Sequence, residues 1–585
     1  MTIFSLESLF MRIKIKDTGE IKELQFLDSS KTDHTRDFLS ASKESSYYYD
    51  YRNDLYITDK MTFNLWETIS NTLQKINERS EAPTINLSAS ENTKMTPTNE
   101  QNNILNLFNN NSGDLKINAY AGTGKTTTLR LITEDHPELN FLYLAFNKAL
   151  QSEASAIFPD NVKCLTTHGL AYRSLKIYDT SWQQRLRREP PEVFESALSL
   201  KKSPFSAISS ANLLTAIRET INSFCRSASD YPEAGHIPFW IYSDHPLIKN
   251  EIMNVVLEYA QKLWNFMTDP DHSIPVTHDF YLKYWQLKNP DLSGYDCLLF
   301  DEAQDANQVT LKVISDQSNI RRIYVGDQHQ QIYSWRGAVN AMNMIQCPLS
   351  AELTQSFRFG TEVAKIAKTI LSLKGEFPDI KGLESIQSVL KNVNKKEPFT
   401  TICRTNTGLI EEALTWADKR KKISVVGGIE EPVRKIKSAY FLYINKKQYI
   451  TDPEIKAYSS WENLKEASKL NDQFEIKRIV KFIQLYKKSV PDILETLVKW
   501  ASYSEDECFV TLTTGHKSKG REWQQVIISE DFADVFEDDN KEYNSSIAAD
   551  IEEINLLYVV ATRAKFILEI PRMLSQHILK KEGAD

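Results

Sequence analysis

The chain has 585 residues, and 70 Lys and Arg against 78 Asp and Glu give it a formal net charge of −8 at pH 7. Domains typically hold about 100 to 200 residues, so this length predicts three to five domains and excludes a single small binding module. The 41% apolar and 25% charged residues are typical of a globular protein, and 18 Gly with 20 Pro exclude a collagen-like or linker-dominated architecture. The negative charge argues at first against nucleic acid as a partner, because phosphate contacts come from Lys and Arg.

The six cysteines stand singly, without a CxxC pair or a Cys/His cluster at metal-ligand spacing. We therefore expect reduced thiols in a cytoplasmic protein, without a structural metal. The N-terminal apolar stretch is short and interrupted by acidic residues, and no apolar run reaches the roughly 18 residues of a membrane span. We expect neither a signal peptide nor a membrane segment.

Residues 1–94 contain two strand-like runs, MRIKIKD and IKELQF, then an amphipathic stretch, FNLWETISNTLQKI, and then a polar segment of linker composition. This order predicts a small α+β module on a tether.

From residue 95 short apolar runs alternate with longer helical patterns, which predicts a parallel α/β sheet with ligands at the carboxyl ends of its strands. The strand-like runs are LKINAY, FLYLAF, VKCLTTH, YDCLLF and IRRIYVGD. A mainly helical, aromatic-rich stretch interrupts this pattern between Tyr172 and Asp291. A second α/β block begins with FTTICRTNTG and KISVVGG, is interrupted at about 446–505, and closes with CFVTLTTGHKSKGREWQQVIIS.

A phosphate-binding loop is predicted where LKINAY is followed by AGTGKT and a helical pattern. Small residues let backbone N–H groups surround the phosphates, Lys125 reaches the β and γ oxygens, the Thr126 hydroxyl binds Mg²⁺, and the helix start adds its positive end. Ala119 replaces the first glycine of the GxxxxGK[ST] pattern. The residues expected around the phosphates are Ala121, Gly122, Thr123, Gly124, Lys125, Thr126 and Thr127. A glycine-rich turn without a ligand is the alternative.

The acidic partner of this loop is predicted at Asp301 and Glu302, directly after the apolar run YDCLLF. The strand delivers Asp301 to the metal ion beside Thr126, and Glu302 is placed to orient or deprotonate the attacking water. A solvated strand edge is the alternative. Together the two elements predict ATP and Mg²⁺ as cofactors.

With these motifs in one chain, residues 95 to about 575 resemble the superfamily 1 helicases of the UvrD/Rep/PcrA type. The similarity is greatest to the F-box DNA helicase branch and its F-box-less bacterial relatives. The motifs that carry it are TNEQ, LAFNKAL, TTHGLA, DEAQD, VGDQHQQIYSWRGA, LTQSFRFG, TGHKSKGREW and LLYVVATRAK, in the family's order. We find no convincing F-box in residues 1–94, so ubiquitin-ligase recruitment is not expected.

The resemblance implies an α/β fold with two RecA-like P-loop motor domains, in addition to the N-terminal accessory module. The expected bounds are 95–174 with 288–350 for the first motor domain, 175–287 for its helical insertion, 351–445 with 506–585 for the second motor domain, and 446–505 for a reduced second insertion.

The resemblance also implies further nucleotide contacts. Gln101 would hydrogen-bond the adenine, Phe357 would pack on it, and Glu522 would contact the ribose. Gln330 would sense the γ-phosphate.

Two arginine fingers, Arg358 and Arg563, come from the second α/β block, whereas the lysine and the acids come from the first. The nucleotide would therefore lie between the two blocks, and hydrolysis would require the cleft to close.

The same resemblance implies a path for single-stranded DNA lined by stacking aromatics. The residues that match it are Phe146, Asn147, Lys148, Thr167, His168, Tyr333, Trp335, Arg336 and His516. Core packing is the alternative for an isolated tryptophan, and we expect it for Trp264 and Trp500. The net negative charge does not exclude DNA as a partner, because the chain has local basic runs at 185–188, 419–422 and 516–519. The first two runs are at least as well explained as solvated faces.

We therefore expect an ATP-dependent 3′ to 5′ translocase or helicase that acts on single-stranded DNA or on forked and tailed duplex. DNA repair, recombination control and anti-phage defence are the expected settings, in the bacterial cytosol or nucleoid. A translocase that strips protein filaments and an ATP-gated sensor or assembly subunit remain alternatives, and RNA stays open as a substrate. Residues 1–94 could bind a protein partner, and the reduced second insertion argues against processive unwinding of long duplex.

Overall fold

The computed structural model describes residues 9–15, 21–28, 96–187, 191–243, 245–333, 340–469, 473–501, 503–536, 547–572 and 574–575. The chain divides into two compact units, Met1–Thr96 and Pro97–Asp585. In the first unit, strands β1 (Leu9–Ile15) and β2 (Ile21–Asp28) pair antiparallel where the sequence predicts strands. The predicted amphipathic stretch at 63–76 lies outside the described residues.

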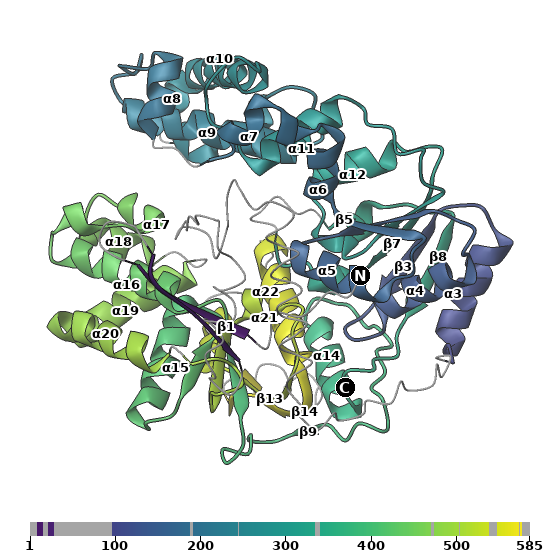
Figure 1. Ribbon diagram of the computed structural model, residues 1–585. Coiled ribbons are helices and arrows are strands. Elements are labelled where there is room, and N and C mark those ends of the chain that lie inside the picture. Colours follow the sequence, from purple (N-terminus) through teal and green to yellow (C-terminus); the bar gives the residue numbers. More distant parts are fainter. Residues whose placement is uncertain are drawn as a thin grey trace. The chain divides into compact units, whose positions relative to one another are not determined.

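The first sheet of the second unit has six parallel strands in the order β5-β4-β6-β7-β3-β8. Figure 1 labels β5, β7, β3 and β8 of this sheet. Its strands are β3 (Leu115–Ala119), β4 (Phe141–Ala145), β5 (Val162–Thr166), β6 (Cys297–Phe300), β7 (Arg321–Gly326) and β8 (Leu349–Leu353). Along β4, Phe141 and Tyr143 join one hydrophobic core while Leu142 and Leu144 join the other. The strand is therefore apolar throughout because both faces of the sheet are covered. β8 extends the sheet three residues beyond the boundary expected at 350.

Helices alternate with the strands of this sheet, as the apolar pattern predicts, and α3 precedes the first strand. They are α3 (Asn99–Asn110), α4 (Lys125–Asp135), α5 (Lys148–Ile157), α6 (Thr167–Ser174), α12 (Gln308–Ser315) and α13 (Ala341–Met344).

The stretch between α6 and β6 is helical, as predicted, and its helices lie together in the blue to teal part of Figure 1. They are α7 (Ser181–Arg185), α8 (Pro191–Leu198), α9 (Ser210–Arg226), α10 (Lys249–Thr268) and α11 (His278–Leu287). Trp264 is buried among them, and its ring contacts Phe224 edge-on at 5.0 Å, which confirms the expected core role. The same hydrophobic core continues to the sheet through Leu298 and Phe300.

Arg185 corrects the expectation for the basic run at 185–188, of which Arg188 lies outside the described residues. Its guanidinium is buried and donates to the carbonyl oxygens of Ile274 (2.7 Å), Asp269 (2.7 Å) and Phe266 (2.9 Å). Burial lowers the pKa of Arg185. Arg185 is therefore neither part of a solvated face nor available to DNA; it holds the turn after α10.

The second sheet also has six parallel strands, in the order β11-β12-β10-β13-β14-β9. They are β9 (Val389–Leu390), β10 (Phe399–Cys403), β11 (Ile423–Val425), β12 (Val510–Thr514), β13 (Trp523–Ile528) and β14 (Ala564–Glu569). The associated helices are α14 (Thr361–Ser372), α15 (Asn406–Asp418), α16 (Glu430–Tyr443), α21 (Gly515–Ser518) and α22 (Ile547–Ala561). Both α/β blocks predicted from the apolar runs are thus parallel sheets.

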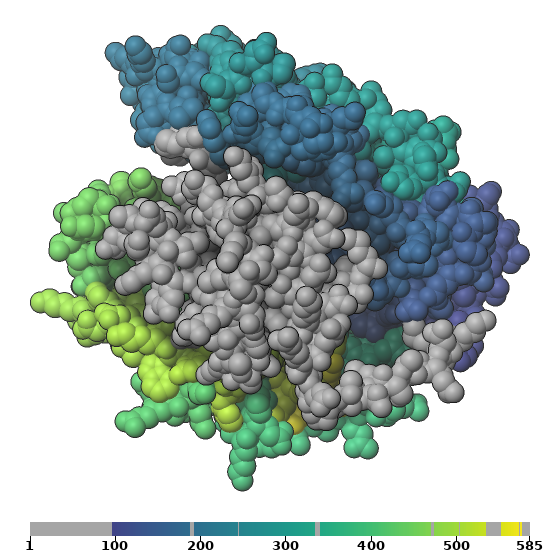
Figure 2. All heavy atoms as spheres, viewed as in Figure 1, coloured from purple at the N-terminus to yellow at the C-terminus, as the bar shows by residue number. Residues whose placement is uncertain are grey.

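The second interruption consists of α17 (Pro453–Lys456), α18 (Trp461–Ala467), α19 (Phe474–Tyr486) and α20 (Val490–Trp500). Its apolar side chains, among them Ile479 and Leu494, belong to the same hydrophobic core as Ile410 of α15 and Leu512 of β12. Trp500 packs against this core, as expected. Figure 2 shows these helices, in green to yellow-green, as a surface continuous with neighbouring green parts of the second half.

Glu475 of α19 fastens this insertion to the sheet domain. Its carboxylate accepts the N–H groups of Asn406 (2.7 Å) and Thr407 (3.1 Å) and the hydroxyl of Thr407 (2.8 Å), all in the first turn of α15. Because the first N–H groups of a helix have no partner within it, this carboxylate acts as a cap from a distant segment. Arg478, one turn further along α19, pairs with Glu411 of α15 at 2.6 Å.

Among the described residues, no helix has the length and apolar character that crossing a membrane requires. Within the same residues, no three His, Cys, Asp or Glu side chains gather into a metal-binding group.

We predict that Glu475→Ala lowers the free energy of unfolding of the second half by about 1–3 kcal/mol, because it leaves buried donors of α15 without an acceptor. Urea unfolding followed by tryptophan fluorescence would measure this, since Trp416 and Trp461 lie in the shared core. Glu466→Ala is the matched control, because Glu466 is an exposed partner of Lys469. Equal midpoints for the two variants would contradict the capping role.

Candidate nucleotide and single-strand site

The phosphate-loop sequence forms a tight turn between β3 and α4. Gly122 and Gly124 have φ angles of 72° and 78°, in the left-handed region that favours glycine. A Cβ on Gly122 would also lie 2.6 Å from Cβ of Arg358, so this position has no room for a side chain. The loop turns directly into α4, whose first residue is Lys125, and Thr126 and Thr127 follow in its first turn. The positive end of a helix thus lies at the loop, as phosphate binding requires.

The acid pair lies at the carboxyl end of β6, next to this loop. Lys125 Nζ is 2.8 Å from Glu302 Oε1, and the Thr126 hydroxyl donates to Asp301 Oδ2 at 3.3 Å. Tyr143 from β4 also donates to Asp301 Oδ2, at 2.7 Å. The structure therefore brings together the four residues predicted to act on phosphate and metal.

Burial and neighbouring charges set the protonation of these groups. Burial raises the pKa of Glu302, but the charges of Lys125 and Lys519 outweigh it and lower the pKa to about 2. Burial and the charge of Glu302 raise the pKa of Asp301. A divalent cation would offset the cost of burying the Asp301 charge, and oxygens such as Thr126 Oγ1 and Asp301 Oδ2 are the ligands that Mg²⁺ prefers. The residues present thus fit the predicted metal.

At the other side of the loop lie the two residues expected to contact adenine. Thr98 and Gln101 form a capping box at the start of α3, and Gln101 Nε2 donates to Thr128 Oγ1 at 3.2 Å. A Cβ built on Gly124 would lie 3.5 Å from Gln101 Nε2 and 3.6 Å from the ring of Phe357. The Phe357 side chain is exposed, and the backbone N–H of Phe357 donates to the carbonyl oxygen of Gly122 at 2.8 Å. Gln101 and Phe357 therefore flank one glycine of the phosphate loop.

The predicted arginines differ in their surroundings. Arg358 lies over Gly122 and pairs with Glu522 at 2.7 Å; Glu522 also pairs with Lys565 at 2.5 Å. Glu522, expected at the ribose, is therefore an ion-pair partner of the first arginine here. Arg563 is buried and donates to Val559 O at 2.8 Å. Burial and the charge of Arg358 lower the pKa of Arg563 to about 9.

Gln330 lies in the segment that follows β7, and this segment is bound by the second half. Its side chain donates to Asp327 Oδ2 at 2.7 Å, and its carbonyl oxygen accepts from Lys519 Nζ at 2.7 Å. Lys519, which follows α21, also pairs with Asp305 of the first half. Burial raises the pKa of Asp305 to about 6, although the charge of Lys519 opposes the rise.

Aromatic residues expected on the DNA path gather at one place. The rings of Phe146 and Tyr333 are stacked, with centroids 5.8 Å apart and planes inclined by 13°. The Tyr333 hydroxyl donates to His516 O at 3.2 Å, and the two rings are 6.3 Å apart. Trp335 and Arg336 lie outside the described residues. In the described part of the path, Phe146 and Tyr333 of the first half thus lie next to His516 of the second half.

The remaining expected DNA contacts have structural partners. Asn147 caps α5 by accepting the Leu150 N–H at 2.9 Å, and Lys148 bonds Gln151 at 2.6 Å. Thr167 is buried in the first turn of α6.

His168 Nε2 lies 3.2 Å from Asp279 of α11, and Asp279 also accepts from Arg226 at 3.0 Å. The helical insertion thereby holds His168 in place.

Several residues of the site were missed by the sequence analysis. Tyr558 and Asn555 of α22 contact the segment after β7, and Gln304 bonds both Glu302 and the Asp327 N–H. The available signal was a polar pair at i and i+3 in the otherwise apolar run INLLYVVA, which predicts two polar side chains on one helix face.

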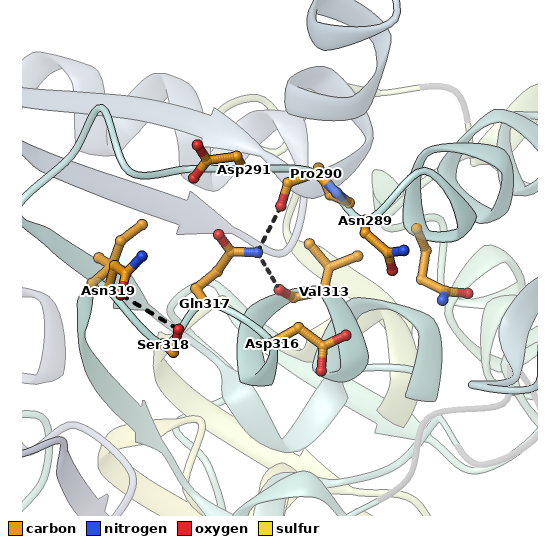
Figure 3. Close-up of a pocket in the computed structure, with 10 residues that line it drawn as sticks. Asn289, Pro290, Asp291, Val313, Asp316, Gln317, Ser318 and Asn319 are labelled. Carbon is orange, nitrogen blue, oxygen red and sulfur yellow. Dashed lines mark hydrogen bonds between the residues drawn. The ribbon is translucent and has the colours of Figure 1, made fainter.

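A separate cavity of about 200 Å³ lies at the opposite edge of the first sheet, before β6 and β7. Figure 3 shows Gln317 at its centre, with the amide directed at the backbone of Pro290 and Val313. Gln317 Nε2 donates to both carbonyl oxygens at 2.9 Å, and Oε1 accepts the Leu292 N–H at 3.0 Å. The Gln317 amide thus binds the loop at 290–292 and is not available to a ligand, so we do not interpret this cavity as a binding site.

The family model and the similar proteins found by comparison are all helicases. The model of the UvrD/REP helicase N-terminal domain matches residues 98–346. F-box DNA helicase 1 of Gallus gallus is 32% identical over 520 residues, which are 83% of this chain and 50% of that protein. F-box DNA helicase protein 1 of Schizosaccharomyces pombe is 32% identical over 501 residues, 80% of this chain and 56% of that protein.

A probable DNA helicase II homolog of Rickettsia felis is 25% identical over 349 residues, 55% of this chain and 49% of that protein. The chain spans about half the length of the relatives that it matches. Residues 98–346 therefore form a UvrD-like superfamily 1 helicase domain, and F-box DNA helicases are among the relatives of this chain.

Proposed function

We propose that this chain is a DNA-dependent ATPase that uses Mg²⁺ and ATP to move 3′ to 5′ along single-stranded DNA, displacing a complementary strand or bound protein. The observation that carries the proposal is the position of Arg358, which lies over Gly122 of the phosphate loop and pairs with Glu522, the residue before β13 of the second sheet. With Arg563 and Lys519 also in that half, nucleotide chemistry at the loop is coupled to the relative position of two sheets. The polarity comes from the family resemblance.

In this proposal the two sheets are RecA-like motor domains with the bounds expected above, except that the first domain extends to Leu353 at the end of β8. Lys125 would exchange Glu302 for the β and γ oxygens of ATP, which frees Glu302 to orient the attacking water. Mg²⁺, held by Thr126 and Asp301, would neutralise charge on the phosphates. Arg358 and Arg563 would stabilise charge that develops on the γ-phosphoryl group, and a finger of this kind is worth roughly 10³ to 10⁵ in rate.

The stacked pair of Phe146 and Tyr333 supports single-stranded nucleic acid as the second ligand. Stacking platforms accept any base at about 1–3 kcal/mol each, which suits a protein that steps along a strand regardless of sequence. The acidic chain needs only a local cationic path for this, because affinity depends on the phosphates contacted. Repair, recombination control and anti-phage defence, a cytoplasmic site of action and a protein partner for residues 1–94 stay predictions.

A second candidate function is an ATP-gated sensor or assembly subunit with little unwinding of its own. The observation that favours it is the second insertion, whose apolar residues are part of the core of the second sheet. An insertion fixed in this way is not free to reorient, so nucleotide binding would signal to a partner more readily than it would drive strand separation.

The central prediction concerns ATP hydrolysis with and without single-stranded DNA. We expect strong stimulation by DNA in the wild type and its loss in Lys125→Ala and Glu302→Gln, because these remove the phosphate contact and the water-orienting group. Trp335→Ala should hydrolyse ATP without translocating. Lys446→Ala, which changes an exposed lysine elsewhere, should behave as the wild type. A wild-type rate unaffected by DNA would refute the motor and favour the sensor.

The raised pKa of Asp305 predicts a pH dependence. Below about pH 6 the carboxyl takes up a proton, so Lys519 loses its charged partner in the other half; above that pH the pair is intact. DNA-stimulated hydrolysis should therefore fall as the pH is lowered, with a midpoint near 6. Asp305→Asn should be slower at neutral pH and lack this step. The same midpoint in both proteins would assign the step to another group.

The fixed second insertion predicts weak unwinding of long duplexes. The purified chain should separate short forked duplexes of about 20 base pairs but release little strand from duplexes several times longer, because no mobile element would hold the separated strands. Strand release followed by fluorescence would compare the two under equal ATP turnover. Efficient separation of the long duplex by the chain alone would contradict the prediction.

A further inference from the structure

Two polar side chains of α22 face the first half of the molecule. Asn555 and Tyr558 lie one turn apart, so they share one face of the helix, and both are almost fully buried in an otherwise apolar run. Each forms hydrogen bonds with the segment that follows β7. Burying a polar group is costly unless it is paired, so these contacts define where α22 can sit against the first sheet.

The Tyr558 hydroxyl joins three parts of the site. It accepts the N–H of Ala121 at 3.1 Å, at the start of the phosphate loop, and it donates to Asp327 Oδ2 at 3.0 Å, at the end of β7. Only a group that is both donor and acceptor can make this pair of bonds, and a phenol is such a group. A second-half helix thus links the phosphate loop to the adjacent strand end.

From Asp327 the hydrogen bonds continue to the water-orienting acid. Asp327 Oδ2 also accepts the Gln330 amide at 2.7 Å, and the Asp327 N–H donates to Gln304 Oε1 at 3.1 Å. Gln304 Nε2 in turn donates to Glu302. A Cβ on Gly326 would lie 2.4 Å from Gln304 Oε1, so glycine at this position allows the close approach.

Asn555 holds the same segment one turn away. Its amide donates to Gln331 O at 2.9 Å, and its oxygen accepts from Lys374 Nζ at 2.5 Å. Gln330 is therefore fixed on both sides: through its own side chain to Asp327, which Tyr558 holds, and through its neighbour Gln331 to Asn555.

We propose that Tyr558 and Asn555 are positioning residues that transmit the location of the second sheet to Gln330 and Glu302. When α22 moves against the first sheet, both bonds change, and the γ-phosphate sensor and the water-orienting acid move with them. This inference rests on the proposed ATPase function and deepens it, because it identifies the contacts through which bound DNA would affect hydrolysis. Neither residue needs to touch the nucleotide.

The experiment compares Tyr558→Phe with Tyr324→Phe in the full chain. Tyr324 is a matched control, because it is buried in β7 three residues before Asp327 but packs against Phe300 in the core instead of facing α22. For each protein, kcat and KM for ATP are measured with and without single-stranded DNA. Amide hydrogen exchange of the peptide that contains Ala121 is measured in parallel.

In Tyr558→Phe we expect the ratio of DNA-stimulated to unstimulated kcat to fall about tenfold, the scale of one lost positioning hydrogen bond, with KM within twofold. Exchange at Ala121 should become faster. Asn555→Ala should also lower the ratio of DNA-stimulated to unstimulated kcat. Tyr324→Phe should change neither quantity. A loss of folded enzyme would lower both rates equally and leave the ratio unchanged, so the ratio separates positioning from stability.

A normal wild-type ratio together with an unchanged ratio in Tyr558→Phe overturns this inference alone and leaves the proposed function standing. An equal fall in Tyr324→Phe also overturns it, because the effect would then belong to any buried tyrosine of this region. A wild type without DNA stimulation overturns the proposed function and this inference with it.

Discussion

A lysine and several carboxylates are buried together at the carboxyl edge of the first sheet, and the rest of the site depends on their mutual neutralisation. Lys125 pairs with Glu302 at 2.8 Å, and Asp305 is paired only because Lys519 arrives from the second half. Removing one partner from a buried pair is far more costly than the pair itself is stabilising. The pair of Asp305 and Lys519 thus ties the two halves to one arrangement, because each half contributes one of its two charges.

The same edge carries a strained backbone. Glu302 has a φ of 51°, in the left-handed region that is costly for a residue with a side chain, and Gln304 fixes its carboxylate from the next turn. Surrounding contacts must supply the energy that keeps such a conformation. A nucleotide whose phosphates attract Lys125 would break the ion pair between Lys125 and Glu302. Lys125 can therefore pair either with Glu302 or with the phosphates, and the nucleotide decides which arrangement is populated.

Much of this fold could be predicted because its determinants are local. Strands such as β4 and β6 are apolar runs that are buried along their whole length, and the phosphate loop needs only residues 119–127 to be recognised. Long-range partners leave no such pattern: Tyr558 and Asp327 are 231 positions apart, and nothing in a basic run shows that Arg185 is buried by carbonyl groups more than 80 positions away. Likewise, the motif predicts Glu522 at the ribose, which stays a prediction, but it does not reveal the ion pairs that Glu522 forms with Arg358 and Lys565. Trp335 and Arg336, outside the described residues, stay predictions.

The second half cannot be shortened by removing residues 446–505 without exposing part of its hydrophobic core. Helices α17 to α20 cover apolar side chains of α15 and β12, and Glu475 completes the hydrogen bonds at the start of α15. If residues 446–505 were deleted, the apolar side chains of α15 and α16 would lose the helices α19 and α20 that pack against them, so the truncated chain would tend to aggregate. Length variation among homologous chains should therefore occur in the loops between these helices and spare the helices themselves. The insertion is short, but its apolar side chains complete the core of the second half.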